Sequence, residues 1–294
     1  MSKHQPDSLH RFLFEAFPVR GELVRLDSTW QEILSRYDYP PSVRTVLGET
    51  LCAAALLAAT IKFRGHLTIQ LHGDGDLELL VVQCTSELLL RGLARWQGEG
   101  DQPVAALLGD GRLVITIEPD DGGERYQGIV PATGDGIAAI IEEYFERSEQ
   151  LSTRLWLSAG GDCTAGLLLQ RLPGEQSDAD AWGRVCHLAE TVSARELRGL
   201  PAEALLQRLF HEESVRLFES RPVSFRCSCS RERIESVIRG LGIKEARAIL
   251  QEQGGIRVAC EFCNRRYKLD AVDVAGLFST PVAVPPVLSR GQRH

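Results

Sequence analysis

The sequence predicts an α+β fold, made of an N-terminal domain of antiparallel hairpins and helices, a helical linker, and a small C-terminal domain. Two pairs of apolar segments flank short turns rich in glycine and aspartate, a pattern typical of β-hairpins. Other segments show the apolar period of amphipathic helices. Strands joined in hairpins, with helices set apart from them, favour α+β over a parallel doubly wound sheet.

The N-terminal domain is expected to span residues 1–173, with residues 1–8 frayed. Thr29-Trp-Gln-Glu32 has the pattern of a capping box at the start of a helix. Residues 41–63 are mostly apolar, and we expect them to form one long core helix. The other expected elements are strands over 66–71, 77–82, 112–118, 126–130, 155–157 and 167–172, and a helix over 137–144.

The linker, residues 174–221, is predicted to be helical. Ser193 and Glu196 have the spacing of a second capping box, and Pro201 suits the first turn of a further helix. The apolar residues that recur at helical spacing in the linker are Trp182, Val185, Leu188, Leu205, Leu209 and Phe210.

The C-terminal domain is predicted to span residues 222–280, followed by a flexible, proline-rich tail, residues 281–294. A core of about 60 residues is marginal on its own and commonly needs a metal or a disulfide. The chain carries eight cysteines, and four of them lie in this domain.

The bulk properties of the chain favour a cytoplasmic protein that has no membrane partner. The chain has 294 residues and a formal net charge of −7, and its N-terminus lacks the apolar segment of a secretory signal. The longest apolar run, residues 51–61, is too short to span a bilayer. Cytosolic thiols are kept reduced, so the cysteines favour metal binding or redox chemistry over a disulfide framework.

Four cysteines, Cys227, Cys229, Cys260 and Cys263, have the spacing of a zinc site. The first two lie in an extended-looking stretch, where residues two apart project to the same face. The last two are separated by two residues, as in the knuckles that hold two thiolates in a tight turn. Four thiolates give the closed tetrahedral set that Zn²⁺ prefers, so we expect one zinc ion per chain and no catalytic residue.

A purely structural zinc module is the simplest interpretation of this spacing, and a redox role is the alternative. A disulfide between Cys227 and Cys229 would be strained and easily reversed. Loss of a structural zinc ion removes on the order of 10–16 kcal/mol of folding free energy, so we expect so small a domain to melt without it. The cationic residues near the cysteines, which favour thiolates, are Arg226, Arg231, Arg233, Arg265 and Arg266.

Short motifs along nearly the whole chain match one known family. They are Phe225–Arg233, Leu241–Glu245, Cys260–Cys263, Tyr267 and Asp270 in the C-terminal part, and Arg11–Phe14, Leu47–Glu49, Lys62–Phe63, Arg91–Gly92, Tyr126–Ile129 and Ser148–Leu151 before it. With these residues the chain resembles the heat-shock protein 33 family of redox-regulated chaperones.

The resemblance implies an ATP-independent chaperone that binds unfolding proteins and prevents their aggregation under oxidative and heat stress, and not an enzyme. It implies that the reduced, zinc-bound form is inactive. Oxidation would form Cys227–Cys229 and Cys260–Cys263 disulfides, release zinc, and activate the protein as a homodimer. The apolar linker residues named above are the candidates for client binding, because melting of the C-terminal domain would expose them.

Two other functions stay open on the residues alone. From residue 221 onward, 13 Lys and Arg stand against 7 Asp and Glu, which is compatible with a nucleic-acid-binding zinc module. The acidic whole and the scarcity of aromatics near the cysteines argue against a nucleic-acid partner. A thiol oxidoreductase would use Cys260 and Cys263, but these do not open a helix after a strand in a βαβ unit.

Two further expectations concern charge and the remaining cysteines. The basic C-terminal part is expected either to dock on the acidic remainder or to carry only solvated charge of little energetic worth. Cys52, Cys84, Cys163 and Cys186 are scattered singly and are expected to be buried and structural, with Cys186 the one most prone to side oxidation.

Overall fold

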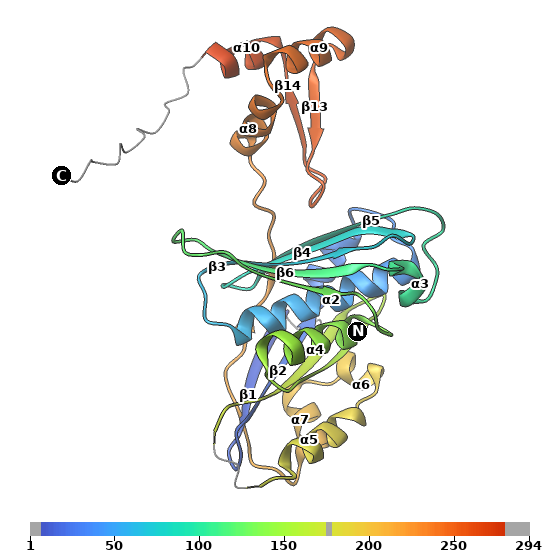
Figure 1. Ribbon diagram of the computed structural model, residues 1–294, viewed down its shortest axis with the longest axis vertical. Coiled ribbons are helices and arrows are strands. Elements are labelled where there is room, and N and C mark those ends of the chain that lie inside the picture. The colour runs from blue at the N-terminus through green and yellow to red at the C-terminus, as the bar shows by residue number, and fades with distance from the viewer. Residues whose placement is uncertain (1–6, 175–177, 280–294) are drawn as a thin grey trace, which may run out of the picture. The chain divides into compact units, whose positions relative to one another are not determined.

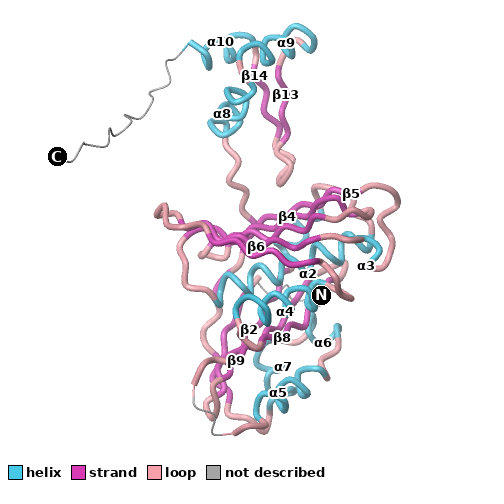
Figure 2. Tube along the Cα trace, in the orientation of Figure 1, coloured by secondary structure: helices cyan, strands magenta, loops and turns pink. Residues whose placement is uncertain are grey.

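The computed structural model describes residues 7–174 and 178–279 (Figures 1 and 2). Contacts within the chain divide it into two compact units, residues 1–227 and 228–294. The first unit contains two mixed layers of strands and helices, and the second is small. The expected α+β class is confirmed.

Two sheets organise the first unit. Sheet A has the strand order β10 (Val215–Leu217), β1 (Ser8–Phe14), β2 (Val19–Leu26), β9 (Thr164–Arg171) and β8 (Thr153–Ala159), with β11 (Arg221–Pro222) also paired to β1. Sheet B has the order β12 (Ser224–Phe225), β5 (Leu89–Trp96), β4 (Leu77–Thr85), β3 (Gly65–His72), β6 (Arg112–Pro119) and β7 (Tyr126–Pro131). Every pairing in the two sheets is antiparallel except that of β12 with β5.

The helices of the first unit lie between the sheets and beyond sheet A (Figure 1). Helix α2 contacts β3, β4 and β5 on one side and β2, β8 and β9 on the other. The helices are α1 (Ser28–Leu34), α2 (Pro41–Thr60), α3 (Val104–Leu108), α4 (Ile137–Tyr144), a π-helical turn η1 (Phe145–Glu149), α5 (Ala181–Glu190), α6 (Ala194–Gly199) and α7 (Ala202–Phe210).

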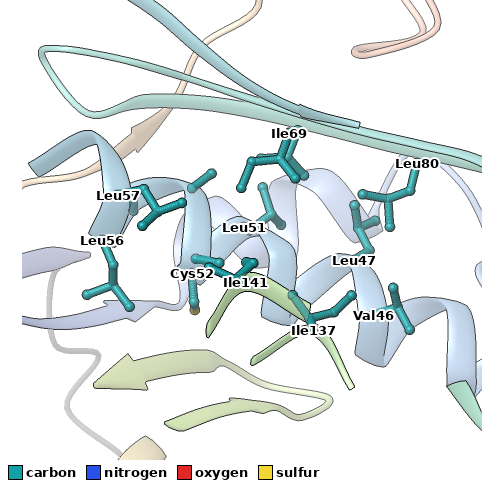
Figure 3. Close-up of a cluster of buried hydrophobic side chains, with 14 of the residues drawn as sticks. Val46, Leu47, Leu51, Cys52, Leu56, Leu57, Ile69, Leu80, Ile137 and Ile141 are labelled. Carbon is teal, nitrogen blue, oxygen red and sulfur yellow. The ribbon is translucent and has the colours of Figure 1, made fainter. Parts of the chain in front are cut away.

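Helix α2 is the centre of the main core. In Figure 3, Leu47 and Leu51 of α2 point toward sheet B, whereas Cys52 and Leu56 point to the opposite side. The thiol of Cys52 lies 3.3 Å from Oγ1 of Thr164 at the start of β9. Although α2 is long and apolar enough to cross a membrane, most of it is buried inside the protein, as befits a helix packed between two sheets.

A second apolar layer joins helices α5, α6 and α7 to the outer face of sheet A. Phe210 of α7 stacks edge-on against Phe14 of β1, with ring centroids 5.0 Å apart. Phe12 lies on the same face of β1 and is also fully buried. The alternation of β1 therefore gives its phenylalanines to the linker helices and Leu9 to the α2 side.

Most local predictions are confirmed. The two expected hairpins are β3–β4 and β6–β7, and the helices over 41–63 and 137–144 are α2 and α4. The expected strand signals over 155–157 and 167–172 are β8 and β9. Ser193 and Glu196 form the predicted capping box at the start of α6.

The first predicted capping box is wrong. Helix α1 begins one residue before Thr29, and its N-cap, Asp27, makes no side-chain cap. The carboxylate of Asp7 instead accepts the backbone N–H groups of Asp27, Ser28 and Thr29 at 2.6, 3.0 and 2.6 Å. Asp7 and Ser8 are therefore held in the fold and not frayed as expected, while residues 1–6 of that prediction lie outside the described part.

The sequence patterns do not predict several of the strands. Strands β1, β2 and β5 were not expected, and the linker is helical only as far as α7, with β10 and β11 following it. β10 and β11 contain three and two residues, too few to show any period, and their pairing with β1 is decided by the rest of sheet A. The expected flexible tail, residues 281–294, lies outside the described residues.

The second unit packs three helices around one hairpin. Its elements are α8 (Arg231–Leu241), α9 (Ile243–Gln253), β13 (Ile256–Ala259), β14 (Arg266–Leu269) and α10 (Ala271–Ser279). Gly254 ends α9 in the left-handed conformation, φ 67°, which glycine adopts without strain. Its buried cluster consists of Ile238, Ala246, Ile256, Leu269, Val274 and Leu277.

Candidate metal centre

The four cysteines predicted to bind zinc come together. The Sγ atoms of Cys227, Cys229, Cys260 and Cys263 all lie within 4.8 Å of one another, and each residue is half-buried. The sulfurs of Cys229 and Cys263 are 3.4 Å apart. Four sulfurs at the usual Zn–S bond length stand about 3.8 Å from each other on a tetrahedron, so the cluster has the size and chemistry for one such ion.

A hairpin turn positions Cys260 and Cys263 between β13 and β14. The N–H of Cys260 donates to the carbonyl of Arg265 at 2.9 Å, and the N–H of Asn264 donates to the carbonyl of Cys260 at 2.7 Å. Asn264 takes the left-handed conformation, φ 54°, that such a turn needs and that asparagine tolerates. The tight turn predicted from the two-residue spacing is thus present.

The other pair does not lie in a strand, contrary to the expectation. Strand β12 ends at Phe225, and the last ladder bond runs from the N–H of Arg226 to the carbonyl of Leu90 at 2.9 Å. Past Arg226 the chain has no partner strand among the described residues, so Cys227 and Cys229 lie in a loop. The division between the two units falls inside this motif, between Cys227 and Ser228.

Helix α8 starts directly after Cys229. Ser230 is its N-cap, and the hydroxyl of Ser230 accepts the N–H of Arg233 at 3.3 Å. The N-terminal end of α8, which carries the positive end of the helix dipole, therefore follows Cys229 by two residues in the chain.

Two polar contacts to the sulfurs were missed by the sequence patterns. The hydroxyl of Tyr267 donates to Sγ of Cys229 at 3.1 Å, and Nη1 of Arg91 lies 3.9 Å from Sγ of Cys227. Arg91 is oriented by Gln83, whose Oε1 accepts from Nε at 2.7 Å. Tyr267 is close to Cys263 in sequence and belongs to a motif noted above, whereas no local signal links Arg91 to a cysteine 136 residues away.

The five arginines near the cysteines contribute unequally. The hydrogen bond with Tyr267 and the neighbouring Cys229 and Cys263 raise the pKa of Arg265. Arg231 instead pairs with Glu235 and Asp273, at 3.0 and 2.6 Å. Arg233 donates to the hydroxyl of Ser228, and Arg226 and Arg266 are exposed. Of these five arginines, Arg265 is therefore the one whose pKa the neighbouring thiolates raise.

The remaining cysteines are buried, as predicted. Burial raises the pKa of Cys52, Cys84 and Cys163, and it raises the pKa of Cys186 to about 11. A thiol with so high a pKa is rarely a thiolate at neutral pH and oxidises slowly. Cys186 is thus better protected than its place in the linker indicates.

The six candidate residues for client binding lie in the layer on sheet A. Val185, Leu205, Leu209 and Phe210 are fully buried there, and Trp182 and Leu188 are partly buried. All six belong to this cluster or pack against it, and the four buried ones present almost no apolar surface in this conformation.

Comparisons with known proteins agree with the motifs. A sequence model of the family described as "Hsp33 protein" matches residues 7–270. The 33 kDa chaperonin of Nitrosococcus oceani is 50% identical over 287 residues, which cover 97% of this chain and 98% of that protein. The 33 kDa chaperonin of Methylobacillus flagellatus is 48% identical over 283 residues, or 95% and 97% of the two chains. The crystal structure of the 33 kDa chaperonin from Thermotoga maritima has the same fold, with a TM-score of 0.80, 22% identity, and coverage of 92% and 97%.

Proposed function

This chain belongs to the Hsp33 family, a family of chaperones and not of enzymes, and from that premise we propose that it is an ATP-independent chaperone switched on by oxidation. The observation that carries the switch is the cluster of four half-buried thiols from two separate segments. In the reduced state Cys227, Cys229, Cys260 and Cys263 hold one Zn²⁺ as thiolates, and the protein is inactive.

The donor set fits zinc. Sulfur ligands exclude the hard cations Ca²⁺ and Mg²⁺, and four thiolates fill the tetrahedral shell that zinc adopts in structural sites. Bound there, the ion cross-links the loop before α8 to the turn between β13 and β14. Tyr267, Arg265 and the start of α8 stabilise the negative charge that the thiolates bring.

Oxidation removes the ligands in pairs. Cys227 and Cys229 form one disulfide and Cys260 and Cys263 form the other, and each bond that forms delivers two electrons to the oxidant. A peroxide that accepts the two electrons, together with two protons from the solvent, is cleaved at its O–O bond and reduced to water and an alcohol or a second water. Loss of four thiolate ligands releases the ion.

The second unit cannot replace the lost cross-link. Its buried cluster contains six side chains among the described residues, two of them valine and alanine. Each disulfide closes a loop of only three or four residues and therefore constrains the unfolded chain little. Metal binding supplies on the order of 10–16 kcal/mol in such domains, so its loss exceeds what this core provides.

Melting then spreads along the chain to the client surface. We place the switch domain at residues 222–280 and the linker at residues 174–221. Destabilisation of the linker lifts the six apolar residues off sheet A, where four are now buried and two partly buried, and a homodimer presents them to unfolding proteins in the cytoplasm. No nucleic acid or membrane takes part.

The test follows metal and client together. Zinc-loaded protein is treated with peroxide at a mildly raised temperature while a chromogenic chelator reports zinc release and light scattering reports aggregation of a heat-unfolding enzyme. Zinc release followed by suppression of scattering, both reversed by a reductant, is the expected result. Zinc that stays bound, or leaves without any gain in protection, refutes the switch.

Two cysteine variants sharpen this test. Cys263→Ser removes one ligand and should protect the client without oxidant. Cys186→Ser is the matched control, because Cys186 is buried outside the cluster, and it should behave like the unchanged chain. Equal behaviour of the two variants would mean that the cluster does not control activity.

A further inference from the structure

Residues 215–226, here called the strap, connect the linker helices to Cys227. The strap is extended and is attached to both sheets, through β10 and β11 to β1 and through β12 to β5. Arg221 reinforces it by donating to the carbonyl of Ser86 at 2.8 Å. The last residue of the strap directly precedes the first candidate zinc ligand.

Strand β12 occupies the edge of sheet B with very few bonds. The N–H of Ser224 donates to the carbonyl of Leu88 at 3.2 Å, and the N–H of Arg226 donates to the carbonyl of Leu90 at 2.9 Å. Leu88 closes the turn between β4 and β5 in the left-handed conformation, φ 63°, and its N–H donates to the carbonyl of Thr85 at 2.9 Å. The β5 edge of sheet B therefore accepts an extended chain from residue 88 onward, and two residues of the strap fill it.

Side chains two residues apart anchor the same stretch. Val223 is 4% exposed and belongs to the main core cluster, together with Leu88 and Leu90. Phe225 packs against that cluster, and the guanidinium of Arg36 lies over its ring. Ser224, between them, is exposed. The pattern apolar–polar–apolar on a sheet edge is how extended peptides are recognised: backbone bonds give affinity and pockets for alternate side chains give selectivity.

The opposite edge of sheet B, along strand β7, is not covered by the strap. Strand β7 has no second partner strand among the described residues, and Tyr126 and Ile129 on it are 42% and 60% exposed. That edge is open whether or not metal is bound. The β5 edge is instead covered by the strap, which is joined through the peptide chain to the first candidate zinc ligand, Cys227.

We propose that β12 occupies a client-binding site in the inactive protein. Release of the strap then lets an extended segment of an unfolded protein pair with the β5 edge in place of β12. The segment carries apolar residues two apart, which enter the positions left by Val223 and Phe225. This site rests on the proposed oxidation switch and adds to it a second contact, made by the sheet and not by the linker helices.

Site-specific photo-crosslinking tests the proposal in the full-length protein. A benzoylphenylalanine replaces Leu89, whose Cα pairs with Ser224 and whose side chain is half-buried, and in a second protein it replaces Ile129 on β7. Both proteins are oxidised, mixed with a heat-unfolding enzyme and irradiated, and light scattering is recorded on the same samples. We expect at least a fivefold rise in client crosslinks from position 89 on oxidation, and little change from position 129.

A backbone variant tests the strap without oxidant. Ser224→Pro removes the N–H that donates to Leu88, and Ser224→Ala keeps it, while the exposed hydroxyl is lost in both. In reduced protein with its zinc content verified, the proline variant should give client crosslinks from position 89 and the alanine variant should not.

The outcomes separate the two proposals. If oxidised protein suppresses scattering but crosslinks no better from position 89 than from position 129, the β5 edge is not a client site and the switch stands. If oxidised protein does not suppress scattering, the switch fails and the edge site falls with it. Crosslinks from position 89 that are equal in reduced and oxidised protein also overturn the proposal, because the strap would then not cover the site.

Discussion

The two units reach stability by different means. The first surrounds α2 with two sheets and adds a second apolar layer under α5, α6 and α7. The second has a six-residue cluster and supplies three of the four thiols that meet at one point, the fourth being that of Cys227 at the end of the first unit. A large core loses little when one contact is lost, whereas a small domain that depends on one ion can be unfolded by changing the chemistry of its ligands. The proposed switch therefore acts on the unit with the smaller core.

Metal removal should show the difference between the two units most clearly. In Cys229→Ser, or after chelation, we expect the hairpin β13–β14 to lose amide protection, because on the order of 10–16 kcal/mol of metal binding is removed. Hydrogen exchange measures this, and tryptophan fluorescence measures the first unit separately, since Trp30, Trp96, Trp156 and Trp182 all lie there. A hairpin that still exchanges slowly without metal would show that the six-residue cluster is sufficient.

A core truncation in the first unit should weaken it without melting it. Phe210→Ala leaves a cavity beside Phe14 and should lower the free energy of unfolding by about 3–5 kcal/mol. Urea unfolding followed by tryptophan fluorescence gives the value. Phe218→Ala is the control, because Phe218 is 38% exposed, and it should cost far less. Similar costs for the two variants would mean that the layer on sheet A contributes little.

The first unit also contains a buried carboxyl group that should destabilise the folded state at high pH. Glu22 of β2 is 1% exposed, its Oε2 has no hydrogen-bond partner, and burial raises its pKa to about 8 although Arg20 and Arg11 lower it. The folded state therefore binds this proton more tightly than the unfolded state, whose glutamate has a pKa near 4.5. The stabilising contribution of the protonated Glu22 carboxyl is complete below pH 4.5, and it is lost as the pH rises through the folded-state pKa of about 8.

Glu22→Gln keeps the shape and removes the ionisation. At pH 9 it should raise the free energy of unfolding by roughly 2–4 kcal/mol relative to the unchanged chain, and at pH 4 it should change it little. Urea titrations at both pH values provide the measurement. A variant that gains no stability at high pH would show that the neighbouring arginines fully support the charged carboxylate.

The smallest expected effect concerns the polar neighbour of the thiols. Tyr267→Phe removes the hydroxyl that donates to Cys229 and should weaken the metal site by about 1 kcal/mol, or raise zinc transfer to a chelator about fivefold. Tyr126→Phe, in the first unit, is the matched control. Unchanged transfer in Tyr267→Phe would assign the support of the thiolates to Arg265 and α8 instead.

The sequence alone was sufficient where the signals are local. Hairpins β3–β4 and β6–β7 follow from alternation and turn residues, α2 and α4 from their apolar period, and the α6 cap from residues three apart. The four cysteine positions also indicate their chemistry by their spacing, because each pair is close in the chain and four thiolates form a typical tetrahedral set for a soft metal ion such as zinc. These features depend on interactions within a few residues, which a linear pattern records.

Only the tertiary structure decided the remaining contacts. Asp7 caps a helix that starts 21 residues later, Arg91 reaches Cys227 across 136 residues, and β12 pairs with β5 through two residues. Each of these contacts depends on which surfaces meet after the sheets form. Contacts between residues far apart in the chain produce no repeating pattern in the sequence, so a local analysis cannot predict them. Two-residue strands such as β11 and β12 are stable only because a longer strand already offers its edge, so no propensity of their own could have indicated them.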